Sequence, residues 1–132
     1  MAKSLKTGVA AMVAAAREKI DQVDAAEAIA MASDPDVVIV DLRDVRERQR
    51  EGYIADSFHC PRGMVEFWVD PESPYYKEIF GRDAKFVFHC ASGWRSALTV
   101  ATLQEMGMEN VAHITNGFNS WREAGGPIEP PE

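Results

Sequence analysis

The sequence predicts an α/β fold with a central, mostly parallel sheet and helices on both faces of that sheet. Three apolar runs, at residues 37–40, 85–89 and 111–114, alternate with segments in which apolar residues have helical spacing. The first run is continuous and β-branched, which is typical of a strand buried on both faces. With 132 residues, 46% of them hydrophobic, the chain is long enough for one domain with a substantial core.

The first predicted element is an amphipathic helix that packs on the domain. Its apolar residues recur with helical spacing: Leu5, Val9, Met12, Val13, Ala16 and Ile20. We therefore expect an N-terminal helical extension over residues 1–22 and a domain over residues 23–132. The nearly apolar run at residues 8–16 follows two lysines, so a cleaved secretory signal is the alternative. Because this run is mostly alanine, we favour the docked helix and a cytoplasmic protein.

The remaining elements alternate in type along the chain. We predict a helix at 24–31 with Asp24 as its N-cap, a strand at 37–40, a helix at 45–51 closed by Gly52, a short strand at 57–60, and between 62 and 80 a helical turn, a loop and a short helix. We then predict a strand at 85–89, a helix at 96–106 capped by Gly107, a strand at 111–114 and a helix at 117–124. The helix at 96–106 is expected to bury Ala97, Val100, Ala101, Leu103 and Met106.

Composition excludes several classes of function. The chain has 14 basic and 21 acidic side chains, a net charge of −7, which argues against binding nucleic acid or an anionic membrane surface through positive charge. Its longest nearly apolar run is about half the length of a membrane-spanning helix, which needs roughly 20 residues. Two cysteines and three histidines without ligand spacing predict no metal site. A small anionic substrate remains compatible, because backbone N–H groups can bind an anion on an acidic protein.

The strongest functional signal is a cysteine between a buried strand and a helix. Cys90 follows the strand at 85–89, and a short loop containing Gly93 leads to the helix that begins near Ser96. Ligands bind at the carboxyl ends of the strands in open α/β sheets. Unpaired N–H groups of the loop and the start of the helix favour an anion there, and the Cys90 thiolate is the natural one. We therefore expect Cys90 to be a nucleophile; an inert buried cysteine is the alternative.

Arg95 strengthens the case for this loop. It places a positive charge at the start of a helix, where the helix dipole favours acidic residues instead. A cation at this position indicates a specific anionic partner. Either an acidic residue such as Asp41 or Glu47 forms an ion pair with Arg95, or Arg95 contacts the substrate directly.

Four segments resemble those of a known family. They are Asp41-Leu42-Arg43 with Glu47 and Gly52-Tyr53-Ile54; Pro61 to Trp68; Cys90 to Ser96, of the form C-x-x-G-x-R-S; and Asn116-Gly117-Phe118 to Trp121 with Gly126-Pro127-Ile128. In these segments the sequence resembles the single-domain rhodaneses, sulfurtransferases that carry sulfur as a cysteine persulfide. The resemblance spans about residues 37–128 and implies the rhodanese-like three-layer α/β fold. Two positions depart from the family pattern: Tyr53 replaces its usual His, and Asn116 replaces a Gly.

The resemblance also implies an activity. A rhodanese moves sulfane sulfur from a small donor, thiosulfate or a persulfide, to a thiol, cyanide or a protein acceptor, in this chain through a Cys90 persulfide. The persulfide would rest in the loop formed by Ala91, Ser92, Gly93, Trp94, Arg95 and Ser96. No cofactor is implied. Asp41, Arg43 and Arg62 are expected to support the site, the first two as an ion pair and Arg62 toward an anionic donor. Cys60 is expected to be a buried small side chain, with a resolving thiol as the alternative.

Two other functions stay open from the sequence. The segment from His89-Cys90 to Arg95-Ser96 also resembles a cysteine phosphatase loop, which has five residues between its Cys and its Arg. This chain has four residues there, and in rhodanese-like families the shorter loop goes with sulfur transfer. A catalytically silent binding module is the other alternative. Trp94 is expected either to meet the acceptor or to pack on Phe67 or Trp68.

Overall fold

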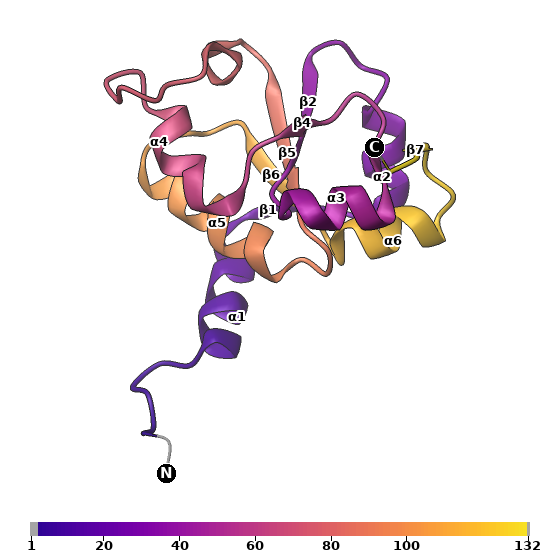
Figure 1. Cartoon of the computed structure of the whole chain (residues 1–132). Helices are drawn as coiled ribbons and strands as arrows, with labels where there is room; N and C mark the ends of the chain where they lie inside the picture. The colour runs from indigo at the N-terminus through magenta and orange to yellow at the C-terminus, as the bar shows by residue number, and fades with distance from the viewer. Residues whose placement is uncertain (1–2, 132) are drawn as a thin grey trace.

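The computed structural model describes residues 3–131 and consists of a parallel five-stranded sheet between two sets of helices (Figure 1). The strands of this sheet are β1 (Asp21–Val23), β2 (Val37–Asp41), β4 (Phe58–His59), β5 (Lys85–His89) and β6 (Val111–Ile114). Their order across the sheet is β1-β6-β5-β2-β4, and every paired neighbour is parallel. A separate antiparallel pair joins β3 (Tyr53–Ile54) to β7 (Ile128–Glu129). The predicted α/β class with a parallel central sheet is therefore confirmed.

The helices follow the predicted order. They are α1 (Val9–Lys19), α2 (Ala25–Met31), α3 (Val45–Glu51), α4 (Val65–Val69), α5 (Trp94–Glu105) and α6 (Gly117–Glu123), with 3-10 turns η1 (Arg62–Met64) and η2 (Glu78–Gly81). Asp24 caps α2 as predicted, because its carboxylate accepts from the Glu27 N–H at 2.8 Å while Glu27 bonds back to the Asp24 N–H. The helix after Cys90 begins at Trp94, two residues earlier than expected.

The two faces of the sheet have separate hydrophobic cores. On one face, apolar residues of α1, α4 and α5 pack on alternate residues of β2 and β5, including Val40 and Phe88. On the other face, α2 and α6 pack on the intervening residues, including Ile39 and Val87. This alternation follows from the period of two in a strand. It confirms that the central strands are covered on both sides.

Helix α1 is only partly docked. Val13, Ala16 and Ile20 are buried against the core that includes α5, as predicted, but Leu5, Val9 and Met12 are exposed. The predicted N-terminal helix is therefore present and docks through its second half, whereas the start of α1 extends beyond the body of the molecule (Figure 1). Strand β1, which follows α1, pairs with β6 and so joins the main sheet.

The remaining differences from the predictions concern short elements and one side chain. The strands β1, β3 and β7 were not predicted; they have two or three residues each, too few for a periodic pattern. Met106 was expected to be buried, but it lies past the last turn of α5 and is exposed. Within residues 3–131, no helix is both long and apolar enough to cross a membrane.

Candidate active site

Cys90 lies at the carboxyl end of β5, directly before the turn that leads into α5. Its residue is only 1% exposed, and the backbone N–H of Gly93 donates to its Sγ at 3.1 Å. Gly93 can turn its N–H toward the sulfur because it adopts a left-handed conformation, with φ of 96°, that a side chain would strain. The loop around it has a half-buried Ala91 and an exposed Ser92. The sulfur of Cys90 thus accepts a hydrogen bond from the backbone of its own loop.

Helix α6 holds the other side of the loop. The N–H groups of Phe118 and Asn119 donate to the carbonyl oxygens of Cys90, at 2.8 Å, and of Ala91, at 3.1 Å. Gly117 has φ of 55°, and a Cβ there would collide with the Cys90 carbonyl oxygen. Asn116, which replaces the family's usual glycine, adopts the left-handed conformation with φ of 59°, which asparagine tolerates better than most residues. The backbone of Cys90 is thus held by the first turn of a helix.

A chain of polar side chains leads from Cys90 across α5 to β1. Ser96 Oγ lies 3.6 Å from Cys90 Sγ and 2.8 Å from His113 Nδ1, and His113 Nε2 lies 2.9 Å from Gln22 Oε1. The Gln22 amide nitrogen donates to the Arg17 carbonyl oxygen at 3.3 Å. Gln22 Oε1 is therefore the acceptor for His113 Nε2–H, which leaves Nδ1 to accept the Ser96 hydroxyl proton.

The protonation of His113 follows from its burial. Burial, and after it the positive charge of Arg17, lowers the pKa of His113 to about 4, so its imidazole is neutral near pH 7. The sequence did not predict a place near Cys90 for His113, Gln22 or Arg17. The available signal was a histidine as the third residue of an otherwise apolar strand, close to the carboxyl end that lines the ligand edge of such sheets.

Arg95 forms a two-pronged ion pair with Glu47 across the start of α5. Its NH1 and NH2 donate to Glu47 Oε1 at 2.7 Å and Oε2 at 3.0 Å. These hydrogen bonds lower the pKa of Glu47 and raise the pKa of Arg95. The nearby Cys90 sulfur also raises the pKa of Arg95. Of the two acidic partners proposed from the sequence, the structure places Glu47, and not Asp41, against Arg95. Direct contact between Arg95 and a substrate stays a prediction.

Asp41 and Arg43 form a fully buried ion pair, as expected. Arg43 donates to Asp41 from Nε at 3.1 Å and from NH2 at 3.0 Å, and Arg48 adds a second cation at 2.9 Å. Arg43 also donates to the Gly52 carbonyl at 2.8 Å and lies 4.0 Å above the Phe118 ring. These contacts tie the end of β2 to α3 and α6, so the pair supports the fold beneath the loop rather than the sulfur itself.

His89 lies between this ion pair and Cys90. Its Nε2 is 3.9 Å from Asp41 Oδ1, beyond hydrogen-bond distance, and its ring stacks on Phe118. Burial lowers the pKa of His89 by more than the Asp41 carboxylate raises it, so the ring is neutral. Burial alone would raise the pKa of Asp41, but the hydrogen bonds and positive charge of Arg43 hold that pKa well below its usual value.

The other residues singled out from the sequence have simpler environments. Arg62 pairs with Glu66 at 2.9 Å, and its backbone N–H donates to Leu42, so its predicted role toward a donor stays a prediction. Cys60 is fully buried, and burial, with Glu66 adding, raises the pKa of its thiol to about 12, which is consistent with a packing role. Trp94 is 44% exposed at the start of α5, where an incoming partner can contact it.

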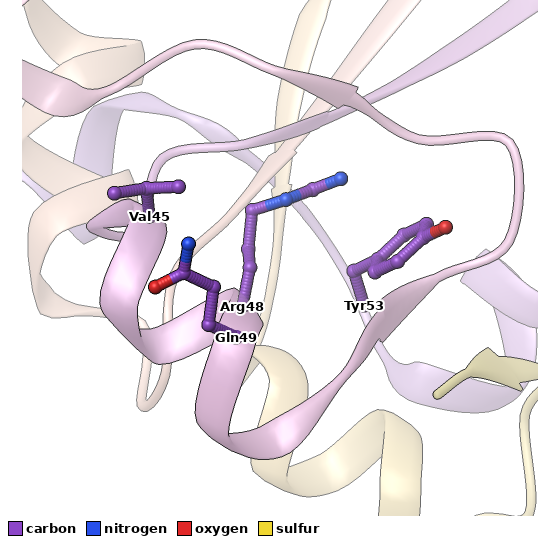
Figure 2. A pocket seen from close by; sticks show the side chains of 4 residues that line it. All are labelled: Val45, Arg48, Gln49 and Tyr53. Atoms are coloured by element: carbon purple, nitrogen blue, oxygen red, sulfur yellow. The ribbon is translucent and has the colours of Figure 1, made fainter. Parts of the chain in front are cut away.

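A small pocket near this region is separate from the loop that carries Cys90. It lies between α3 and β3 and is lined by Val45, Arg48, Gln49 and Tyr53 (Figure 2). Its volume is about 50 Å³, well below the ~300 Å³ at which small-molecule pockets begin. None of the loop residues from Cys90 to Ser96 lines it. Across residues 3–131, no three His, Cys, Asp or Glu side chains are grouped so that they could hold a metal ion.

Comparison with known proteins defines the family. A family model for the rhodanese-like domain matches residues 24–124, so the chain belongs to the rhodanese family. Thiosulfate sulfurtransferase GlpE of Actinobacillus succinogenes is 27% identical over 100 residues, which cover 75% of this chain and 81% of that protein. Arsenate reductase 2.2 of Oryza sativa is 25% identical over 118 residues, which cover 83% of this chain and 87% of that protein.

One solved structure is much more similar. A Rhodopseudomonas palustris protein of unknown function, described as a possible tyrosine phosphatase, is 53% identical, with a TM-score of 0.94. The match covers 98% of this chain and 99% of that one, so it includes α1 as well as the domain that the family model matches. Proteins similar to this chain thus include a sulfurtransferase, an arsenate reductase and a possible phosphatase.

Replacing Gly117 with alanine should destabilise the protein. Both a positive φ and the collision with the Cys90 carbonyl oppose a Cβ there, whereas Gly125, with φ of 80°, has open space around its Cβ position. We expect Gly117→Ala to lower the free energy of unfolding by about 2 kcal/mol more than Gly125→Ala does. Urea unfolding of both variants measures the difference. Equal losses would mean that α6 does not press on the Cys90 backbone.

The stability of the protein should decrease in mild acid because of its buried histidines. The unfolded chain protonates His113 near pH 6.5, but the folded protein does so only near its pKa of about 4. Between these values the unfolded state binds more protons, so the free energy of unfolding should fall by about 3 kcal/mol as the pH decreases. His113→Asn, which keeps an acceptor for Ser96, should make this fall shallower. Parallel pH profiles for the two proteins, from urea unfolding, would contradict the assignment.

Proposed function

We propose that this protein is a sulfurtransferase that carries sulfane sulfur on Cys90. The observation that carries the proposal is the N–H of Gly93 directed at Cys90 Sγ, 3.1 Å away, in a loop with only four residues between Cys90 and Arg95. Such a loop stabilises a thiolate, and afterwards the outer sulfur of a persulfide, with backbone donors. The similarity to a thiosulfate sulfurtransferase, at 27% identity, supports the same proposed function.

The reaction proceeds in two steps. In the first, the Cys90 thiolate attacks the outer sulfur of thiosulfate, a new S–S bond forms, and the bond to the sulfonate sulfur breaks with its electron pair, so sulfite leaves. In the second, cyanide or a thiolate attacks the outer sulfur of the Cys90 persulfide, and the thiolate of Cys90 is regenerated. No net oxidation or reduction by an outside reagent is needed in the cyanide reaction. A covalent intermediate of this kind gives ping-pong kinetics.

A phosphatase is the second candidate, because the relative at 53% identity is described as a possible tyrosine phosphatase. Two features favour sulfur transfer instead. Cys90 is 1% exposed, so a single terminal sulfur reaches it more readily than a phosphorus atom surrounded by oxygens. A phosphatase also needs a protonated acid for its leaving group. The pKa values of Asp41 and Glu47, the carboxyl groups held beside this region, lie below their usual range, so neither holds a proton near pH 7.

A silent binding module is the remaining alternative. In that case the loop would recognise a partner or an anion without forming a covalent bond. The burial of Cys90 alone is compatible with such a role, but packing does not require the N–H of Gly93 to turn toward the sulfur at the cost of a left-handed residue. Transfer chemistry accounts for that geometry.

Cys90 should be the only thiol that carries sulfur. After incubation with thiosulfate, the mass of the protein should rise by about 32 Da and fall back after cyanide, as covalent catalysis requires. Cys90→Ala should show no mass increase, while Cys60→Ala, the matched control in the other buried cysteine, should load normally. Intact-mass spectrometry with peptide mapping makes the measurement. A loaded Cys60, or an unmodified wild-type protein with every sulfane donor, would contradict the scheme.

The protein should prefer sulfur transfer to phosphate hydrolysis. With four loop residues between Cys90 and Arg95, the ring of N–H donors is too narrow for three phosphate oxygens during in-line attack. We expect turnover of an aryl phosphate to be at least tenfold slower than formation of thiocyanate from thiosulfate and cyanide. Parallel assays on one preparation decide the matter, with Cys90→Ala as the blank. Faster turnover of the aryl phosphate would replace the sulfurtransferase assignment with that of a phosphatase.

A further inference from the structure

Arg17 of α1 reaches the loop that carries Cys90. A Cβ built on Gly93 would lie 3.6 Å from Arg17 NH2, so this guanidinium lies beside the residue whose N–H binds the Cys90 sulfur. Arg17 also acts on His113, whose pKa its positive charge helps to lower. The family model begins at residue 24, so Arg17 comes from outside the segment that defines the family.

The charge of Arg17 has no counterion among residues 3–131. The other arginines around the site are each paired with a carboxylate: Arg43 and Arg48 with Asp41, Arg62 with Glu66, and Arg95 with Glu47. Arg17 forms no such ion pair with a described residue, and its Nε is buried without a hydrogen-bond partner there. An unpaired, partly buried guanidinium is costly. An anion that binds at this place would remove that cost.

The position of Arg17 is fixed by the fold. Val13 and Ala16, on the preceding turn, are buried in the core that includes α5, and Ile20 follows them there. The carbonyl of Arg17 accepts a hydrogen bond from Gln22, which in turn binds His113. The guanidinium therefore extends from an anchored part of α1, while the exposed first half of the helix projects away from the body (Figure 1).

We propose that Arg17, a residue outside the segment that the family model matches, binds the sulfonate end of the thiosulfate donor. This inference rests on the proposed sulfur transfer at Cys90. The outer sulfur of the donor faces Cys90 while its sulfonate oxygens accept hydrogen bonds from Arg17. When the S–S bond of the donor breaks, the electron pair moves onto the sulfite that leaves, and Arg17 neutralises part of its charge.

The charge balance of the protein makes this cation important. The chain has a net charge of −7, which repels a dianion approaching the site. Arg95 does little to offset that repulsion, because Glu47 neutralises it with two hydrogen bonds. The loop residues Ala91, Ser92 and Gly93 have no charge of their own. Arg17 is thus the uncompensated positive charge beside the loop among the described residues.

Steady-state kinetics with one matched control tests the proposal. Arg17→Gln should raise the KM for thiosulfate by about tenfold or more, the usual effect of losing one charged hydrogen bond. Lys19→Gln, which removes the same charge from an exposed position of the same helix, should change this KM less than twofold. Arg17→Lys should restore most of the affinity.

Binding measured without turnover separates the outcomes. On the Cys90→Ala protein, calorimetry should show that thiosulfate binds, and that adding Arg17→Gln weakens this binding by the same factor. The inference about Arg17 would be overturned if thiosulfate bound equally well with and without Arg17, or if Arg17→Gln and Arg17→Lys weakened binding equally. In either case, loading of the wild-type protein with sulfur would still support the proposed sulfurtransferase function. Tighter binding of inorganic phosphate than of thiosulfate would also overturn the donor assignment. A wild-type protein that takes no sulfur at all would refute the proposed function instead.

Discussion

The site depends on the close contact between the start of α6 and the backbone of Cys90 and Ala91. Phe118 and Asn119 donate to the two carbonyl oxygens, and Gly117 permits the approach because it has no side chain to collide with them. The N–H groups at a helix start have no partner inside the helix, so this contact satisfies donors and acceptors together. While these two carbonyl oxygens bond to α6, the N–H of Gly93, further along the loop, donates to the Cys90 sulfur.

The alternation of side chains along the strands sorts the polar groups beneath the loop into two sets. Asp41 and His89, register partners on β2 and β5, lie on the face covered by α6, where they join the Arg43 ion pair. His113 lies on the opposite face, under α5, and contacts Ser96. The first set stabilises the turn after β2, whereas the second reaches the Cys90 sulfur. A one-residue shift of either strand would exchange these roles.

The sequence predicted the long elements and the position of Cys90 between a buried strand and a helix, but not the groups that other segments bring to this loop. The strand that precedes Cys90 and the helix closed by Gly52 have clear patterns and end signals, so their limits are confirmed. Strand β1 exists only because β6 offers it a partner, and nothing within three residues could indicate that. The partner of Arg95 stayed open for the same reason, since Glu47 is distant in sequence and adjacent only in the folded chain.

The order of the strands explains how a segment outside the family match comes to contribute to the site. Because β1 adds to the sheet beside β6, which is itself beside β5, the chain before β1 must cross the α5 face of the molecule. Because of this path, Gln22 is the register partner of His113, and Arg17 lies beside Gly93. A charge beside Cys90 is therefore supplied by a helix that lies outside the segment matched by the family model. Such an arrangement gives a physical route by which related loops serve substrates of different charge.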